Sequence, residues 1–417
     1  MQEVLPQRQT PVRTRSRTWT LLTAIWGFAI VAILPVLFHW TARPPRISRT
    51  SLAGQLGWVA AAIICYCFYR AESRRLPRLQ AIGLVLVIFL LTSFANNLHS
   101  FYVDKTSNYF VTIPNERWQE NLQNDVVRLS PSVAPHSYRF LPNGIVAWMQ
   151  LANVRFSVAR DVYRLLFGLL LFYAIYRFAR LYTSHAGAVL AMLLVAVVYP
   201  ISFEWYAGQL TDPLSHLSFV LAFIFLETAN FPLLLTTLLI GSVAKESVLA
   251  LVGFYILFCR RERRYLLKAC VLAITSAAVY FGIRLYVFKG VIHYNQVSGV
   301  GPSQFWANWY DPRWPALFLI TACAYLPFLV LGWKQTPLLL KRMVFFLVPV
   351  LFFSSMLFSW MTETRNFMPV VFVLAVVAAR YFARSTAPEE DSYMPAQRMN
   401  AAAKIPPQTG PKIGTQA

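Results

Sequence analysis

The chain has 417 residues, of which 57% are hydrophobic and only 13% are charged, against the ~25% charged residues of typical soluble domains. Apolar runs near the ~20 residues that cross a bilayer recur along its length, which excludes a soluble fold and predicts an all-α, polytopic transmembrane bundle. The net charge of +21 does not indicate nucleic acid, because the basic residues form short clusters beside the apolar runs.

The apolar runs predict single spans and one broken span. The first, at about 19–40, follows a basic tail (1–18) and is too long for a signal-peptide core, so we expect a retained anchor. The polar segment 385–417 is predicted to be a disordered cytoplasmic tail. The remaining single spans are predicted at about 52–69, 79–98, 158–180, 185–203, 212–229, 265–288, 314–333, 343–360 and 367–384.

The broken span, 231–259, is an apolar stretch interrupted by Lys245 and Glu246. As one helix it would be about 43 Å long, well beyond the ~30 Å hydrocarbon core. We therefore expect a hairpin of two short helices with Lys245 and Glu246 at its tip. The basic cluster 260–268, which follows the hairpin, is then expected on the same side of the membrane as the start of the hairpin.

The charged residues divide between the two faces of this topology. About 11 or 12 membrane segments place both termini on one side with 23 of the 38 lysines and arginines, and the positive-inside rule identifies that side as the cytoplasm. Ten of the 17 acidic residues lie on or near the other side. The large loops of that side are expected at about 99–141 and 289–313. We therefore expect a transmembrane domain over 19–384 that works at its non-cytoplasmic face.

The first candidate for chemistry is Asp104, a few residues past the third predicted span. A carboxylate held where a loop leaves the membrane can act as a general base toward an acceptor hydroxyl, if burial raises its pKa toward the working pH. A solvated loop carboxylate is the alternative interpretation. Glu116 and Asp125 lie in the same loop, so the sequence does not decide which acid is the base.

Two positions are candidate phosphate ligands. The first large loop ends at Tyr138 and Arg139. The arginine either donates two hydrogen bonds to a substrate phosphate or extends only to the lipid headgroups. Lys245 carries the sharper signal, because ionisable residues at membrane depth are costly and usually face a cavity or a partner. We interpret Lys245 as a phosphate ligand that Glu246 orients, and structural pairing of the two residues is the alternative.

Two further turns carry charges on the same face. Asp212 precedes Pro213 at the start of a span, where helix capping would explain it, or it binds a cation or sugar hydroxyls together with Glu204. Glu363 and Arg365 join the last two spans, and Arg365 is either a second phosphate ligand or part of an ordinary polar turn. The five cysteines lie in or at the ends of apolar spans, so neither a disulfide framework nor a metal site is predicted.

Taken together, these positions resemble the bacterial multi-pass proteins of the C-type (GT-C) glycosyltransferase superfamily, which move a sugar from a polyprenyl-phosphate donor to an acceptor on the non-cytoplasmic face. The resemblance covers about 95–385 and implies a location in the bacterial inner membrane. It implies Asp104 as the base and Lys245 and Arg365 as ligands of the donor phosphate. The likeness lies in an acid-bearing loop closing at 138–142, Thr-Asp-Pro at 211–213, Lys-Glu at 245–246 and Glu-x-Arg at 363–365.

The expected function is therefore transfer of a sugar from a polyprenyl-phosphate-linked donor to a saccharide, lipid or protein acceptor. Further substrate contacts are expected from Tyr138, Arg139, Asp212, Glu246 and Glu363. No cofactor is indicated, and the need for a divalent metal stays open. A transporter or flippase of a lipid-linked sugar or other amphiphile, or a non-catalytic membrane scaffold, is the alternative. Convergence of Asp104 with the cations Arg139, Lys245 and Arg365 on one cavity would favour the transferase.

Overall fold

The computed structural model describes residues 52–105, 115–130, 133, 136–199, 202, 209–260, 262, 264–288 and 301–386. Within these residues the secondary structure is helical and contains no strand, which confirms the all-α prediction for this part of the chain. The predicted first span at 19–40, the basic tail 1–18 and residues from 387 onward lie outside the described residues.

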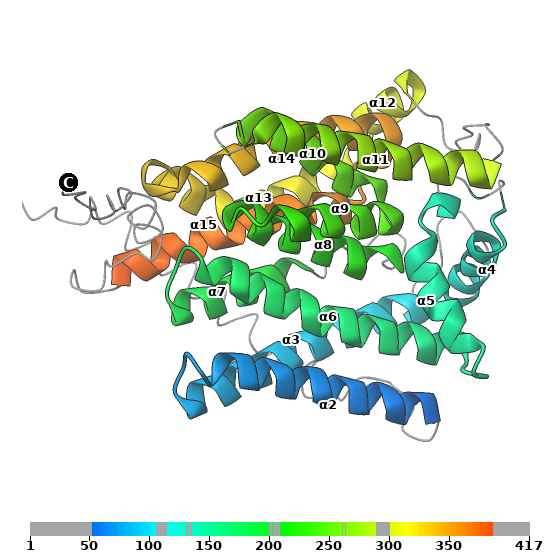
Figure 1. The fold of residues 1–417 in the computed structure, drawn as a ribbon, viewed down its shortest axis with the longest axis horizontal. Helices are drawn as coiled ribbons and strands as arrows, with labels where there is room; N and C mark the ends of the chain where they lie inside the picture. Colours follow the sequence, from blue (N-terminus) through cyan, green and yellow to red (C-terminus); the bar gives the residue numbers. More distant parts are fainter. Residues whose placement is uncertain are drawn as a thin grey trace, which may run out of the picture.

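The helices form one bundle (Figure 1). The α-helices are α2 (Leu52–Glu72), α3 (Arg78–Lys105), α4 (Asn115–Val127), α5 (Phe140–Gln150), α6 (Phe156–Arg180), α7 (His185–Val198), α8 (Thr211–Glu227), α9 (Phe231–Ala244), α10 (Ala250–Phe258), α11 (Tyr265–Phe288), α12 (Pro302–Trp309), α13 (Arg313–Gly332), α14 (Leu338–Phe358) and α15 (Met368–Thr386). Short 3-10 helices are η2 (His136–Tyr138), η4 (Glu246–Leu249), η5 (Trp333–Gln335) and η6 (Thr364–Phe367).

Five helical stretches of the described residues are long and apolar enough to cross a membrane. Shorter apolar helices, such as α7 and α9, complete the bundle. The described part of the chain is therefore an all-helical bundle with five helices of membrane-spanning length and composition, which is fewer than the 11 or 12 segments expected. The five stretches are Arg78–Ser100, Phe156–Arg180, Tyr265–Tyr286, Leu338–Phe358 and Thr364–Arg384.

The broken span folds back on itself. α9 ends one residue before Lys245, whose backbone is extended (φ −163°, ψ 123°), and η4 and α10 follow. The ring of Phe231, at the start of α9, lies 6.0 Å from the ring of Tyr255, near the end of α10. Lys268, from the basic cluster, has its Nζ 5.6 Å from the same Phe231 ring. The predicted hairpin is therefore confirmed, with Lys245 at its tip.

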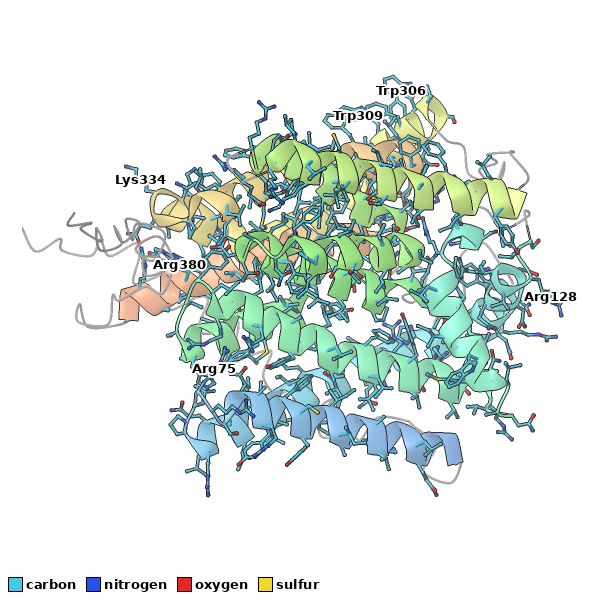
Figure 2. The ribbon with its side chains drawn as sticks, in the orientation of Figure 1. Arg75, Arg128, Trp306, Trp309, Lys334 and Arg380 are labelled. Carbon is cyan, nitrogen blue, oxygen red and sulfur yellow. The ribbon has the colours of Figure 1, made fainter. Side chains whose placement is uncertain are left out.

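Basic side chains gather at one end of the bundle. Arg75 between α2 and α3, Lys334 after α13 and Arg380 in α15 all lie at the left in Figure 2, whereas Arg128 after α4 lies at the right. Arg380 Nη1 donates to the main-chain oxygen of Tyr182, between α6 and α7, at 2.9 Å. The turns that carry the predicted basic clusters thus lie together, at the end opposite α4 and α5.

The site is positioned by close helix packing. α6 lies in the middle of the bundle and packs against α2, α3, α7 and α8 (Figure 1). α9 packs closely on α8 because Gly241 has no side chain: a Cβ there would lie 2.8 Å from Ser218 Cβ and 2.8 Å from Val248 Cγ1. This approach brings the end of α9 beside the start of α8.

The two large loops predicted at 99–141 and 289–313 are partly helical. α3 continues to Lys105, so Asp104 lies in the last turn of a helix and not in a loop, which corrects the sequence prediction. Near the end of the apolar run the polar side chains of Asn96, His99 and Ser100 are buried, and Ser100 Oγ donates to the Asn96 carbonyl at 3.1 Å. α4 occupies the middle of the first loop and α12 the end of the second.

Candidate functional site

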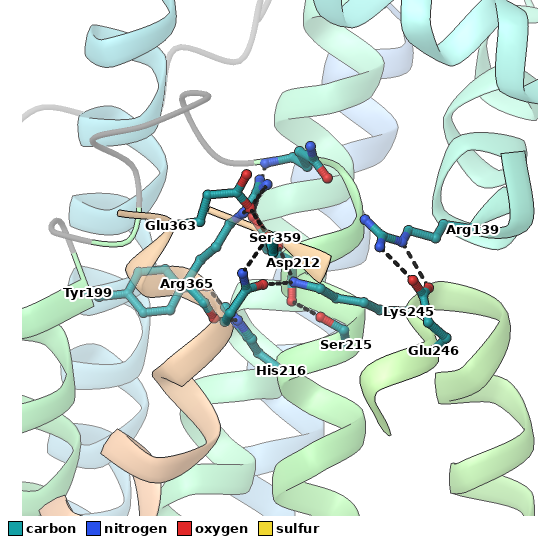
Figure 3. A network of polar contacts seen from close by, with 12 residues as sticks. Arg139, Tyr199, Asp212, Ser215, His216, Lys245, Glu246, Ser359, Glu363 and Arg365 are labelled. Atoms are coloured by element: carbon teal, nitrogen blue, oxygen red, sulfur yellow. Dashed lines mark hydrogen bonds and ion pairs between the residues drawn. The ribbon is translucent and has the colours of Figure 1, made fainter. Parts of the chain in front are cut away.

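Six charged side chains from four separate segments meet at the end of the bundle that carries α5 (Figure 3). We call them the ionic cluster. The segments are the turn before α5, the start of α8, the tip of the α9–η4 hairpin and the turn that leads into α15. The members are Arg139, Asp212, Lys245, Glu246, Glu363 and Arg365, each of which was predicted as a substrate contact.

Asp212 lies between two cations. Its Oδ1 is 3.6 Å from Lys245 Nζ, and its Oδ2 is 3.5 Å from Arg365 Nη1. Oδ2 also accepts a hydrogen bond from the Gln209 backbone N–H at 2.9 Å. Asp212 is only 2% exposed, and no side chain caps α8, so helix capping does not explain this residue. A carboxylate buried in this way holds both cations in place.

Each of the two cations has a second partner. Lys245 Nζ donates to Asn366 Oδ1 at 2.8 Å, and Arg365 Nη2 donates to Glu363 Oε2 at 2.6 Å. Ser359 links these partners, because its Oγ donates to Glu363 Oε2 and accepts from Asn366 Nδ2. Both cations are buried, so their positions are fixed before any ligand arrives.

Glu246 pairs with Arg139 and not with its neighbour Lys245. Arg139 Nε and Nη2 donate to the two Glu246 carboxylate oxygens at 2.9 and 2.6 Å. The expectation that Glu246 orients Lys245 is therefore not what this geometry shows. The physical reason is local, because consecutive side chains on extended backbone point to opposite sides, and Lys245 is extended.

Tyr138, also a predicted contact, is buried beside the cluster and holds another arginine. The guanidinium carbon of Arg284 lies 4.1 Å from the Tyr138 ring centroid and 3.4 Å from that of Tyr280. Arg284 Nη1 donates to the Tyr280 carbonyl, whereas its Nε and Nη2 are buried without a hydrogen-bond partner among the described residues. Three carboxylates balance the three cations of the ionic cluster, so Arg284 adds positive charge beside it.

Three polar residues that contact the ionic cluster, His216, Ser359 and Asn366, were not predicted from the sequence. His216 Nε2 donates to the Arg365 carbonyl at 3.1 Å, which fixes the Nε2–H tautomer, and its Nδ1 lies 3.3 Å from the Tyr199 hydroxyl. The available signal was spacing, since His216 stands four residues after Asp212 and therefore on the same helix face.

The position of the general base stays a prediction. The structure places the backbone of Asp104 in the last turn of α3, which packs against α4, but its side chain lies outside the described part. Glu116 is in the first turn of α4, and Asp125 is in the same helix. Glu204 is outside the described residues. Within the described part, no group of three His, Cys, Asp or Glu side chains could hold a metal ion.

Two pockets border the ionic cluster. The first, with a cavity volume of about 20 Å³, is mostly apolar and reaches Thr364, the neighbour of Arg365; it is lined by Val198, Ser202, Phe318, Thr364, Phe367, Met368 and Val371. The second, with a cavity volume of about 20 Å³, lies beside Asp212; it is lined by Trp118, Gln119, Leu122, Val126, His136, Asn143, Gln209, Leu210 and Thr211. Trp306 and Trp309 are half exposed on α12, at the surface in Figure 2.

No protein-family model, curated protein or solved structure matches this chain. Its function therefore has to be inferred from the chemistry of its own residues. The arrangement that offers such chemistry is a set of fixed, buried cations between an apolar pocket and a polar one.

Proposed function

We propose that this protein is an integral membrane glycosyltransferase that moves a sugar from a polyprenyl-phosphate-linked donor to an acceptor at the non-cytoplasmic face. The observation that carries the proposal is the convergence of Arg139, Lys245 and Arg365, from three distant parts of the chain, on one cluster. Ionisable residues in membrane helices usually mark a substrate path or site.

A phosphate is the ligand whose chemistry suits these cations. Arginine presents a planar fork of donors to phosphate oxygens, and lysine presents a compact charge. In the absence of ligand, Asp212, Glu246 and Glu363 hold the cations, which avoids isolated buried charges. The extra charge of Arg284 favours an anion at this end of the bundle.

The lipid part of the donor is proposed to lie along the apolar side chains beside Arg365. The apolar side chains are Phe318, Phe367, Met368 and Val371, and the last three belong to Thr364–Arg384, a stretch of spanning length. A phosphate held by Arg365 would therefore leave the first isoprene units against apolar side chains. Burial of this chain contributes roughly 25 cal/mol per Å² of apolar surface removed from water.

The proposed reaction is a displacement at the anomeric carbon. The acceptor oxygen forms a bond to that carbon while the bond from carbon to the phosphate oxygen breaks, and polyprenyl phosphate leaves with the bonding electrons. Lys245 and Arg365 stabilise the charge that develops on the departing phosphate. The acceptor proton passes to a carboxylate, for which we propose Asp104. In this scheme the basic end of the bundle and both termini face the cytoplasm.

The direct test uses purified protein in lipid nanodiscs with a radiolabelled polyprenyl-phosphate monosaccharide and a cell-envelope extract as acceptor. Time-dependent release of unlabelled polyprenyl phosphate, with label in the acceptor fraction, is expected. In proteoliposomes, movement of the intact lipid across the bilayer without release would instead support the transporter. Absence of both activities, together with no binding of polyprenyl phosphate, would support a scaffold.

A further inference from the structure

Arg284 is a buried arginine near the end of α11, within the stretch of spanning length Tyr265–Tyr286. It is only 3% exposed, whereas the next two residues, Leu285 and Tyr286, are 59% and 80% exposed. The helix therefore directs this cation toward the interior of the bundle and its two neighbours outward. Ionisable residues placed in this way in membrane helices usually pair with an opposite charge or mark a substrate path.

Among the residues that the structure describes, Arg284 has no carboxylate partner. Its Nη1 donates to the Tyr280 carbonyl at 3.2 Å, and its Nε and Nη2 have no hydrogen-bond partner. The carboxylate of Glu246, in the adjoining ionic cluster, already accepts two hydrogen bonds from Arg139. A buried charge without an opposite charge is costly, and a water molecule would supply an acceptor but no negative charge. The group that suits Arg284 is therefore an anion.

The two unpaired donors of Arg284 lie on one edge of the guanidinium. Nε and Nη2 are the same two donors with which Arg139 binds both carboxylate oxygens of Glu246 (Figure 3). Two donors in this fixed arrangement match two oxygens of one carboxylate or phosphate group. The same end of the bundle thus contains one guanidinium edge bound to an internal anion and a second edge with no partner in the described part.

The plane of the Arg284 guanidinium is fixed by its surroundings. Its central carbon lies 4.1 Å from the Tyr138 ring centroid and 3.4 Å from that of Tyr280. These contacts and the Nη1 hydrogen bond hold the side chain in place, so little freedom is lost when a ligand binds. Tyr138 directly precedes Arg139, and the side chains of Arg139 and Glu246 are 13% and 22% exposed. The edge therefore adjoins the accessible side of the ionic cluster.

We infer that Arg284 binds the phosphate group of a lipid, with two phosphate oxygens on Nε and Nη2. The ionic cluster contains equal numbers of cations and carboxylates, so Arg284 leaves one positive charge in excess, which one phosphodiester anion would neutralise. Arg284 also lies two residues before the end of a spanning stretch, and lipid phosphates lie just outside the hydrocarbon core. The inference rests on the phosphate-binding part of the proposed function and not on the transfer step.

The test measures binding of polyprenyl phosphate and of uncharged polyprenol by native mass spectrometry in a maltoside detergent, which contains no phosphate. Arg284→Met removes the charge and both free donors. It should weaken binding of polyprenyl phosphate about 10–100-fold, the range for hydrogen bonds to charged groups, and change binding of polyprenol less than about twofold. Arg284→Lys keeps the charge without the paired donors, so its affinity should lie between those of the wild type and Arg284→Met.

Arg380→Met is the matched control. Arg380 is also buried in a stretch of spanning length and donates Nη1 to a main-chain carbonyl, but it lies at the opposite end of the bundle. Its substitution should leave the affinity for polyprenyl phosphate unchanged. Phosphatidylglycerol, measured with the same variants, distinguishes the two sources of a lipid phosphate. If Arg284→Met weakens binding of polyprenyl phosphate alone, the ligand is the donor lipid; if it weakens phosphatidylglycerol alone, the ligand is a membrane phospholipid.

A thermal measurement separates binding from a structural role. Polyprenyl phosphate should raise the Tm of the wild type and of Arg380→Met and should not raise that of Arg284→Met, whatever the Tm of each protein without ligand. An equal rise in Arg284→Met, or an equal loss of binding for polyprenol and polyprenyl phosphate, would overturn the inference alone. A wild type that binds polyprenyl phosphate no more tightly than polyprenol, and does not bind phosphatidylglycerol, would overturn the proposed function and this inference with it.

Discussion

Arg139 and Glu246 lie 107 residues apart and form a two-pronged ion pair, with N–O distances of 2.9 and 2.6 Å. The pair joins the turn before α5 to the tip of the α9–η4 hairpin. It therefore connects the first predicted loop to the residues of the ionic cluster that the hairpin tip supplies. The link fixes the start of α5 beside the hairpin tip, and α5 in turn packs against α4 and α6.

The pair should contribute to stability as well as to position. A double-mutant cycle with Arg139→Gln and Glu246→Gln should give a coupling free energy of about 1–2 kcal/mol, since hydrogen bonds to charged groups contribute more than neutral ones but both side chains are partly exposed. The measurement is SDS-induced unfolding in mixed micelles. Additive single effects would show that the two residues act independently.

Gly241 should be required for the approach of α8 and α9. Gly241→Ala places a methyl group 2.8 Å from Ser218 and Val248, and we expect a loss of about 1–3 kcal/mol, together with reduced donor binding, because Asp212 and Lys245 separate. Gly83→Ala is the matched control, since no atom lies within 4 Å of a Cβ there. Equal behaviour of the two variants in unfolding assays would contradict the packing explanation.

Lys245 should be essential for donor binding and not for folding alone. Lys245→Met removes the charge but keeps the length of the side chain, and transfer should fall below detection while the protein still elutes as a monodisperse peak. Lys245→Arg should also be poorly tolerated, because a guanidinium does not fit a cavity shaped for an ammonium held by Asn366 and Asp212. Lys334→Met, at the opposite end, is the control, and unchanged transfer in both Lys245 variants would reduce this residue to a structural role.

Asp104 should affect the chemical step and not the binding step. Asp104→Asn is expected to leave binding of polyprenyl-phosphate sugar near normal and to lower turnover by about 10²–10⁴-fold, the usual range for loss of general-base help. Glu116→Gln and Asp125→Asn are the comparison variants. If one of these loses turnover and Asp104→Asn keeps it, the base lies in α4; if all three stay active, the proposed mechanism is wrong.

The two ends of the bundle should face opposite sides of the membrane. In a background without the five native cysteines, Asn121→Cys and Asn124→Cys, both exposed on α4, should react with a membrane-impermeant maleimide added to intact cells. Arg75→Cys and Lys334→Cys should react only after the cells are opened. Labelling of Lys334→Cys from outside would reverse the orientation of the whole bundle.

The sequence by itself determined the class of protein and the position of the break in the hairpin. Crossing a bilayer requires long apolar segments, and a charged pair inside an apolar stretch is too costly to be an ordinary part of one span. For that reason most of the helices lie close to predicted spans, and Lys245 lies at the predicted tip, whereas α4, α5 and α12 were not predicted as spans. All six residues of the ionic cluster were predicted as substrate contacts, because their charges stand in or beside turns between apolar segments.

Only the tertiary structure decided which of these residues are partners. Lys245 and Glu246 are adjacent in the chain, yet they bind Asp212 and Arg139 respectively, because an extended residue directs neighbouring side chains to opposite sides. The separation of α8 from α9 depends on the missing side chain of Gly241, which no hydropathy pattern reports. Partner choice over a hundred residues follows from how helix ends are packed, and packing is a property of the whole bundle.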